Sequence, residues 1–263
     1  MRRRRVLVLV VAALCGVATG CGASGTGSSA SSSNAGSGGV SGTITVFAAA
    51  SLKESFTGLG RQFESAHPRT KVVFNFGPSS GLAAQIAQGA PADVFASASP
   101  KNMTQVTHAG LAPSATTFAR NVMAVAVPPT NPGRVTQLSD LGKPAVKVAL
   151  CQSSVPCGAT AAKVFANAGV KVTPVSQEVD VKAVLAKVTL GEVDAGVVYV
   201  TDVRSAGAKV KGIGIPDDVN ASTDYPIATL STSANKATAQ AFTDLVLSDQ
   251  GASALARAGF AKP

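Results

Sequence analysis

The stretch TITVFAAASL, residues 43–52, joins an apolar, β-branched run to the start of a helical pattern. From Ser51 onward apolar residues recur at helical spacing, so this stretch predicts a buried strand followed directly by an amphipathic helix. The same unit repeats, with strands expected at 43–47, 71–76, 93–96, 121–127, 147–150 and 195–199, and helices from 51 and at 81–89, 101–109, 159–168 and 181–190. Such alternation predicts an α/β fold with a mostly parallel sheet and helices on both faces.

The folded part is longer than one small α/β sheet needs, and turn-forming residues interrupt it at Pro128-Pro129 and at Asp224-Tyr225-Pro226. We expect the chain to change lobes near these points. The sequence therefore predicts two α/β lobes with a central ligand cleft, the first formed by residues 43–123 and 224–263 and the second by 124–223. A cleft between lobes is the usual position for a small ligand.

The N-terminus has the features of an export signal rather than of a folded element. Arg2 to Arg5 are basic, Val6 to Thr19 are apolar, and small residues lead into Cys21. The apolar segment is too short for an ordinary membrane span. The sequence around Cys21 resembles a bacterial lipobox, although Ala18 stands where leucine is usual. We expect a signal peptide over 1–20, lipidation of Cys21, and a flexible Gly/Ser tether over 21–42 that anchors an extracytoplasmic protein to the cell membrane.

Composition excludes several other classes of protein. The chain has 263 residues and a net charge of +9, but four of its basic residues are Arg2 to Arg5. It has no Trp, two Tyr and no basic stripe interleaved with aromatics, which argues against a nucleic-acid partner. With two His and four Cys, a multi-ligand metal site is not expected, and neither is a cofactor. Nothing in the sequence indicates oligomerisation, so we expect a monomer.

Candidate binding residues lie at the junctions between predicted strands and the helices that follow them. Ser51 and Ser79 each follow a strand and begin a helix, where a hydroxyl and unsatisfied N–H groups can hold an anion. Each serine could equally be a simple N-cap. Cys157 precedes another helix and offers free amides, while Tyr199 ends an apolar strand and could face the cleft or pack in the core.

Two catalytic functions are alternatives to anion binding: a serine hydrolase and a cysteine enzyme. The segment GPSSG, residues 77–81, matches the nucleophile elbow of serine hydrolases, which would make Ser79 catalytic. However, only His108 follows it, with Asp93 as the one acid between them, and this spacing is too short for that scaffold. Cys151 and Cys157 are more consistent with a structural disulfide outside the cytoplasm than with thiolate catalysis, because no histidine is placed to assist. We therefore expect a binding protein and no enzyme.

Several blocks of the sequence together resemble one known family. They are residues 44–52, 79–82, 89–95, 155–158, 178–181 and 196–199. In order and spacing they are similar to the molybdate-binding proteins of bacterial ABC molybdate importers. The resemblance implies a type II periplasmic-binding-protein fold whose two lobes close on one tetrahedral oxyanion, molybdate or tungstate. It also implies ABC permease subunits as partners and a site without a basic side chain.

The resemblance also assigns the binding residues. Ser51 and Ser79 would each offer a hydroxyl and an amide, Cys157 and Val181 would offer amides, and Tyr199 would offer its hydroxyl. No protein group would ligate the metal atom directly. The family more usually has alanine where this chain has Cys157, but the donor there is the amide. A sulfate or other oxyanion receptor is the nearest alternative, since sulfate has the same charge and shape as molybdate.

Overall fold

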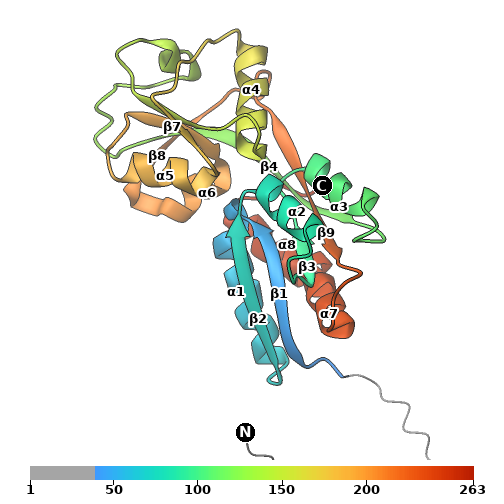
Figure 1. The fold of residues 1–263 in the computed structure, drawn as a ribbon. Coiled ribbons are helices and arrows are strands. Elements are labelled where there is room, and N and C mark those ends of the chain that lie inside the picture. The colour runs from blue at the N-terminus through green and yellow to red at the C-terminus, as the bar shows by residue number, and fades with distance from the viewer. Residues whose placement is uncertain (1–38) are drawn as a thin grey trace, which may run out of the picture. The chain divides into compact units, whose positions relative to one another are not determined.

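The computed structural model describes residues 39–263, and Figure 1 shows how their elements are arranged. The strands are β1 (Gly42–Ala49), β2 (Thr70–Gly77), β3 (Val94–Ala96), β4 (Thr116–Val127), β5 (Val148–Cys151), β6 (Ser176–Glu178), β7 (Ala195–Tyr199), β8 (Lys211–Gly214) and β9 (Ser222–Thr229). The α-helices are α1 (Lys53–Ala66), α2 (Ser79–Ala87), α3 (Pro100–His108), α4 (Pro156–Ala168), α5 (Val181–Thr189), α6 (Val200–Ala206), α7 (Lys236–Leu247) and α8 (Asp249–Ala258).

The strands form two lobes that share two long strands. The order is β2-β1-β3-β9-β4-β7-β5-β6, with β8 also paired to β4. Strand β4 pairs with β9 through residues 116–122 and then with β7 and β8 through residues 123–127, so it passes from lobe 1 into lobe 2. Strand β9 returns the chain to lobe 1, where it pairs with β3. The boundaries expected after residues 123 and 223 stay a prediction.

The expectation of a mostly parallel sheet is wrong. Strands β1, β2 and β3 are parallel to one another in lobe 1, and β5, β6 and β7 are parallel in lobe 2. Every pairing made by β4 or β9 with these strands, with β8 or with each other is antiparallel. The physical reason is that one of the two strands leaves lobe 1 and the other comes back, so they must run in opposite directions. Strand–helix alternation predicts the parallel parts but cannot show these crossings.

The core of lobe 1 contains a cluster of aromatic side chains. Phe56 and Phe63 on α1 pack against Phe242 on α7, with ring centroids 6.1 and 5.6 Å apart. These helices cover the sheet that contains β1, and Ile44 and Val46 of β1 belong to the same core. Edge-to-face contacts of this kind fix the helices more specifically than area burial alone. Lobe 1 therefore holds the carboxyl ends of β1 and β2 on a rigid support.

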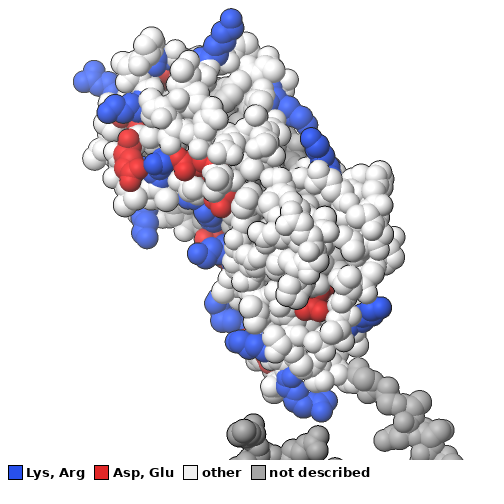
Figure 2. All heavy atoms as spheres, viewed as in Figure 1, with Lys and Arg blue, Asp and Glu red and all other residues white. Residues whose placement is uncertain are grey.

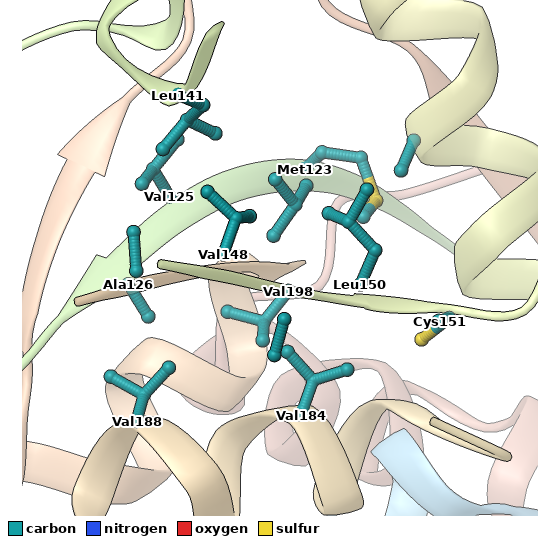
Figure 3. Packing of buried hydrophobic residues seen from close by; sticks show 14 of the residues in the cluster. Met123, Val125, Ala126, Leu141, Val148, Leu150, Cys151, Val184, Val188 and Val198 are labelled. Atoms are coloured by element: carbon teal, nitrogen blue, oxygen red, sulfur yellow. The ribbon is translucent and has the colours of Figure 1, made fainter. Parts of the chain in front are cut away.

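The core of lobe 2 is aliphatic and is built mainly from valines. Figure 3 shows Val184 and Val188 of α5 pointing toward the strands. Val198 of β7 lies between these two side chains and the core residues beyond the sheet. Gly196 allows this approach, because a Cβ atom there would lie 2.6 Å from Val184 Cγ1. The close packing sets the position of α5 and hence of its N-terminus.

The fold begins slightly before the expected end of the tether. Ser41 exchanges two backbone hydrogen bonds with the Thr238 hydroxyl of α7, at 3.0 and 2.7 Å, and Gly42 already belongs to β1. The expected signal peptide, Cys21 and most of the tether lie outside the described residues. Within residues 39–263 no helix combines the length and the hydropathy that a membrane span requires.

Candidate functional site

A single cavity brings all five expected binding residues together. Residues of both lobes line it, and its volume of about 20 Å³ is far below the roughly 300–1,000 Å³ typical of pockets for drug-sized molecules. The lining residues are Ala49, Ala50, Ser51, Gly77, Pro78, Ser79, Ala98, Val155, Pro156, Cys157, Asp180, Val181 and Tyr199. The size suits a small ion better than a sugar or a peptide.

The lobe 1 wall follows from the register of two parallel strands. Ala49 of β1 pairs with Gly77 of β2, so the two strands end at the same edge of the sheet. Ser51 and Ser79 come two residues after these paired positions and therefore lie side by side in the wall. Helices start at both points, and neither start has a side-chain cap. Their first N–H groups have no partner within the helix and remain open to a ligand.

Both serine hydroxyls are held by hydrogen bonds to the protein. The Ser79 Oγ accepts a hydrogen bond from the Ala98 amide at 2.9 Å, so its own hydrogen is free to donate. The Ser51 Oγ lies 2.8 Å from the Tyr225 hydroxyl, and Asn121 Nδ2 lies 3.5 Å beyond. Burial raises the pKa of Tyr225, which keeps this phenol protonated. Tyr225 can therefore donate to Ser51 and leave the serine hydrogen for a ligand.

In lobe 2 the starts of α4 and α5 form the facing wall. Helix α4 has proline at its first position and no side-chain cap, which leaves the Cys157 amide as its first donor. Cys157 is joined to Cys151 by a disulfide. The loop between them lies so close to α4 that a Cβ atom at Gly158 would be 2.0 Å from the Gln152 carbonyl oxygen. The disulfide and this close approach together fix the donor at Cys157.

Tyr199 is the most informative group in the cavity. It ends β7, its side chain is 1% exposed, and its hydroxyl has no hydrogen-bond partner among the described residues. Burial raises the pKa of Tyr199 well above its usual range, so the hydroxyl remains a donor. A buried donor without an acceptor is unfavourable. The Tyr199 hydroxyl is therefore available to donate to an acceptor in the cavity.

Sequence reasoning missed one charged residue in the wall, Asp180. It is the N-cap of α5, and its Oδ1 accepts a hydrogen bond from the Ala183 amide at 2.9 Å. An aspartate directly before an apolar helical run is a typical N-cap, so the local pattern could have identified it. Asp180 therefore adds an acceptor to the wall beside the five expected donors. Val181, next to it, still presents the first amide of α5.

The cavity contains no basic side chain: among the residues that the structure describes, no Lys, Arg or His lines it. Within the same residues no cluster of His, Cys, Asp or Glu could hold a metal ion. Asp93 does not line the cavity and does not assist Ser79. Its carboxylate instead accepts hydrogen bonds from the Thr45 amide at 2.7 Å and the Ser233 hydroxyl at 2.6 Å. Among the described residues no histidine lines the wall beside Ser79, so the arrangement can bind an anion but lacks the general base of a serine hydrolase.

Several known proteins are similar to this chain over most of its length. The chain is 42% identical over 222 residues to the molybdate-binding protein ModA of Mycobacterium tuberculosis, covering 84% of this chain and 85% of that one. It is 34% identical over 237 residues to ModA of Escherichia coli, covering 83% and 89%. The solved periplasmic molybdate-binding protein of Azotobacter vinelandii superposes with a TM-score of 0.75 at 21% identity, covering 84% and 99%.

These findings confirm the two-lobed periplasmic-binding-protein fold and the resemblance to molybdate-binding proteins. They also confirm that the chain is a binding protein rather than an enzyme. The profile of bacterial extracellular solute-binding proteins matches residues 44–261, and the chain belongs to that family.

Proposed function

We propose that this protein captures molybdate outside the cytoplasm and delivers it to the permease of an ABC importer. The observation that carries the proposal is the small cavity in which donors from both lobes converge, with no basic side chain among the described residues that line it. The identity of 42% to a molybdate-binding protein supports the choice of ligand. Tungstate has the same charge and tetrahedral shape, and we expect it to bind as well.

The proposed ligand contacts are all donors. Ser51 and Ser79 would each give a hydroxyl and an amide, Cys157 and Val181 their amides, and Tyr199 its hydroxyl. A buried dianion loses much hydration free energy, and charge-assisted hydrogen bonds of about 1.5–3 kcal/mol each can offset that loss. The partial positive charge at the helix N-termini adds to this stabilisation. Lobe closure follows, because a ligand that contacts both lobes favours the state in which they meet.

Selectivity would depend on protons and on size. Phosphate near neutral pH carries a proton that needs an acceptor, whereas the five proposed contacts are all donors and the Asp180 Oδ1 in the described wall already accepts from the Ala183 amide. We expect phosphate to bind poorly for this reason. Sulfate carries no proton, so only the size of a rigid cavity can exclude it. A receptor for sulfate or another oxyanion is therefore the alternative function.

Calorimetric titration separates these ligands. Molybdate, tungstate, sulfate and phosphate are titrated in parallel into the mature protein at constant ionic strength. The proposal predicts tight one-to-one binding of molybdate and tungstate, with sulfate weaker and phosphate undetectable. Preferential binding of sulfate would establish the alternative, and no binding of any of the four would contradict both.

We also propose that the protein acts as a monomer attached to the cell membrane through lipidated Cys21. The Gly/Ser-rich tether would hold the binding domain clear of the lipid surface. In a native host grown with labelled fatty acid, the protein should carry label and partition into detergent. A Cys21→Ser variant should lose the label and appear in the soluble fraction. Equal labelling of both proteins would refute lipidation at this residue.

A further inference from the structure

One lysine beside the cavity contacts both lobes. Lys182 is the second residue of α5 in lobe 2, and its Nζ lies 2.8 Å from Glu54 Oε2 in the first turn of α1 in lobe 1. The same Nζ lies 3.1 Å from Asp202 Oδ1 and 3.1 Å from the Ser205 hydroxyl, both in α6 of lobe 2. Figure 2 shows basic and acidic side chains gathered around α5 and α6, whereas the surface over α2 and α3 is almost uncharged.

Glu54, Lys182 and Asp202 are shielded from solvent to different degrees, which affects how strongly their charges interact. The side chain of Asp202 is fully buried, that of Lys182 is 20% exposed and that of Glu54 is 51% exposed. Burial disfavours the charged form of Lys182, but Asp202 and Glu54 outweigh it and its pKa is raised. Burial also raises the pKa of Asp202 to about 6, against the opposing effect of Lys182. Charged groups shielded from solvent interact more strongly than exposed pairs.

Each of the three charged residues, Glu54, Lys182 and Asp202, lies within three residues of a proposed ligand contact. Glu54 follows Ser51 in the chain, and Lys182 follows Val181 directly. Asp202 follows Tyr199 by one helical turn, and its Oδ2 accepts a hydrogen bond from the Tyr199 amide at 3.1 Å. The ion pairs therefore hold together the same three segments that a ligand would contact, although none of the three charged side chains lines the cavity.

We infer that Glu54 and Lys182 form a latch between the lobes, which stabilises the closed arrangement and so slows the release of bound oxyanion. The inference rests on the proposed function. The Glu54–Lys182 pair can form only when the two lobes meet, so its free energy belongs to the closed state alone. Stabilising the closed state alone raises ligand affinity by up to the factor to which that stabilisation corresponds, without any contact to the ligand. Glu54 and Lys182 are thus positioning residues.

The same helix supplies a matched control. Lys187 of α5 lies 3.1 Å from Glu192 Oε2 and 3.7 Å from Glu178 Oε1, and all three residues belong to lobe 2. This cluster has the same chemistry but does not cross between lobes. Removing it should leave the balance between open and closed arrangements unchanged. Glu192→Gln is therefore the control for Glu54→Gln, and Lys187→Gln is the control for Lys182→Gln.

The test measures molybdate affinity and dissociation rate for the wild type, these four single variants and the Glu54→Gln/Lys182→Gln double variant. Glu54→Gln should weaken affinity by about two- to fivefold, mainly through faster dissociation, the range expected for a partly exposed ion pair. Glu192→Gln should match the wild type. In a Lys182→Gln background the effect of Glu54→Gln should disappear, because the partner is already absent. Lys182→Gln alone leaves buried Asp202 without its cation, so Glu54→Gln is the decisive variant.

A second readout needs no ligand. Small-angle scattering of the unliganded proteins should give a larger radius of gyration for Glu54→Gln than for Glu192→Gln. Equal affinities and equal radii for these two variants would overturn the latch. If the wild type binds no molybdate, the proposed function fails, and the scattering comparison alone then decides whether the latch exists.

Discussion

The two walls of the cavity are prepared in different ways. In lobe 1 the hydroxyls of Ser51 and Ser79 are already hydrogen-bonded, to Tyr225 and to the Ala98 amide. In lobe 2 the Tyr199 hydroxyl is buried with no partner among the described residues, and the donor at Cys157 is held by a disulfide instead. The first wall is oriented by its neighbours, whereas the second contains a buried donor that a ligand can satisfy.

This difference separates two contributions to binding. Groups oriented before the ligand arrives lose little entropy on binding, so they provide affinity at low cost. A group left unsatisfied destabilises the empty protein, and the ligand removes that penalty. Substitutions in lobe 1 should therefore lower both stability and affinity, whereas Tyr199 should show opposite effects on the two quantities.

The largest effect is expected at Ser79. Ser79→Ala removes a donor to the dianion and also deprives the buried Ala98 amide of its acceptor. Molybdate affinity should fall by about ten- to hundredfold, and the free energy of unfolding should fall as well. Calorimetry and thermal unfolding measure the two changes. Ser80→Ala, in the same helical turn but outside the cavity wall, is the control, and equal affinities of the two variants would remove Ser79 from the site.

Tyr199→Phe gives the clearest contrast between the walls. The variant loses one hydrogen bond to the ligand, so affinity should fall by about tenfold. The unliganded protein should become equally or more stable, because an unsatisfied buried hydroxyl is removed. Chemical denaturation without ligand measures this second change. A clear loss of stability would mean that the hydroxyl has a protein partner in solution.

Tyr225→Phe should have a smaller effect on affinity. Tyr225 lies behind Ser51 and does not line the cavity, so its loss frees the serine hydroxyl to rotate without removing a ligand contact. Affinity should fall by about threefold, and unfolding free energy should fall by about 1 kcal/mol. Paired titrations of this variant and Tyr199→Phe check the order. Were Tyr225→Phe the more damaging of the two, the division between wall and support would be wrong.

Replacing both Cys151 and Cys157 with serine should affect stability more than binding. Removing a disulfide that closes so short a loop lowers the free energy of unfolding by about 2 kcal/mol. Affinity should fall only about twofold, since the donor is the Cys157 amide and close packing at Gly158 still holds the loop. Unchanged stability together with unchanged affinity would show that the disulfide does not organise this wall.

At Asp180 we expect a small gain in affinity rather than a loss. Asp180→Asn keeps a side chain that can cap α5 and removes a negative charge from the cavity wall. Affinity for a dianion should rise by about two- to threefold from reduced repulsion. Titration of molybdate measures it, with Asp194→Asn on lobe 2 as the control. Weaker binding by Asp180→Asn would mean that the carboxylate orders the Val181 donor rather than repelling the ligand.

Much of the fold could be predicted because its pattern is local. The strand at 43–47 and the helix from Ser51 correspond to β1 and α1, and the predicted helix at 181–190 corresponds to α5 within one residue. Strand β9 was missed, since Asp224-Tyr225-Pro226 has the composition of a turn but lies in a strand between β3 and β4. Helices α6, α7 and α8 were also not predicted.

The cavity residues could be predicted from position in the chain, but their partners could not. Ser51 and Ser79 follow adjacent parallel strands, so their proximity is implied by the strand order. Tyr225 and Asn121 lie about 100 residues apart in the chain and meet only because β9 pairs with β4. No local pattern shows that the Glu54 side chain reaches Lys182 across the lobes. Such contacts depend on the tertiary arrangement alone.

The most direct test of the central claim is a crystal structure with molybdate, using anomalous scattering from molybdenum. We predict one anomalous peak in the cavity between the lobes, with oxygen atoms within hydrogen-bond distance of the Tyr199 hydroxyl, the Ser79 hydroxyl and the Cys157 amide. A peak elsewhere on the protein, with these three donors unoccupied, would contradict the account.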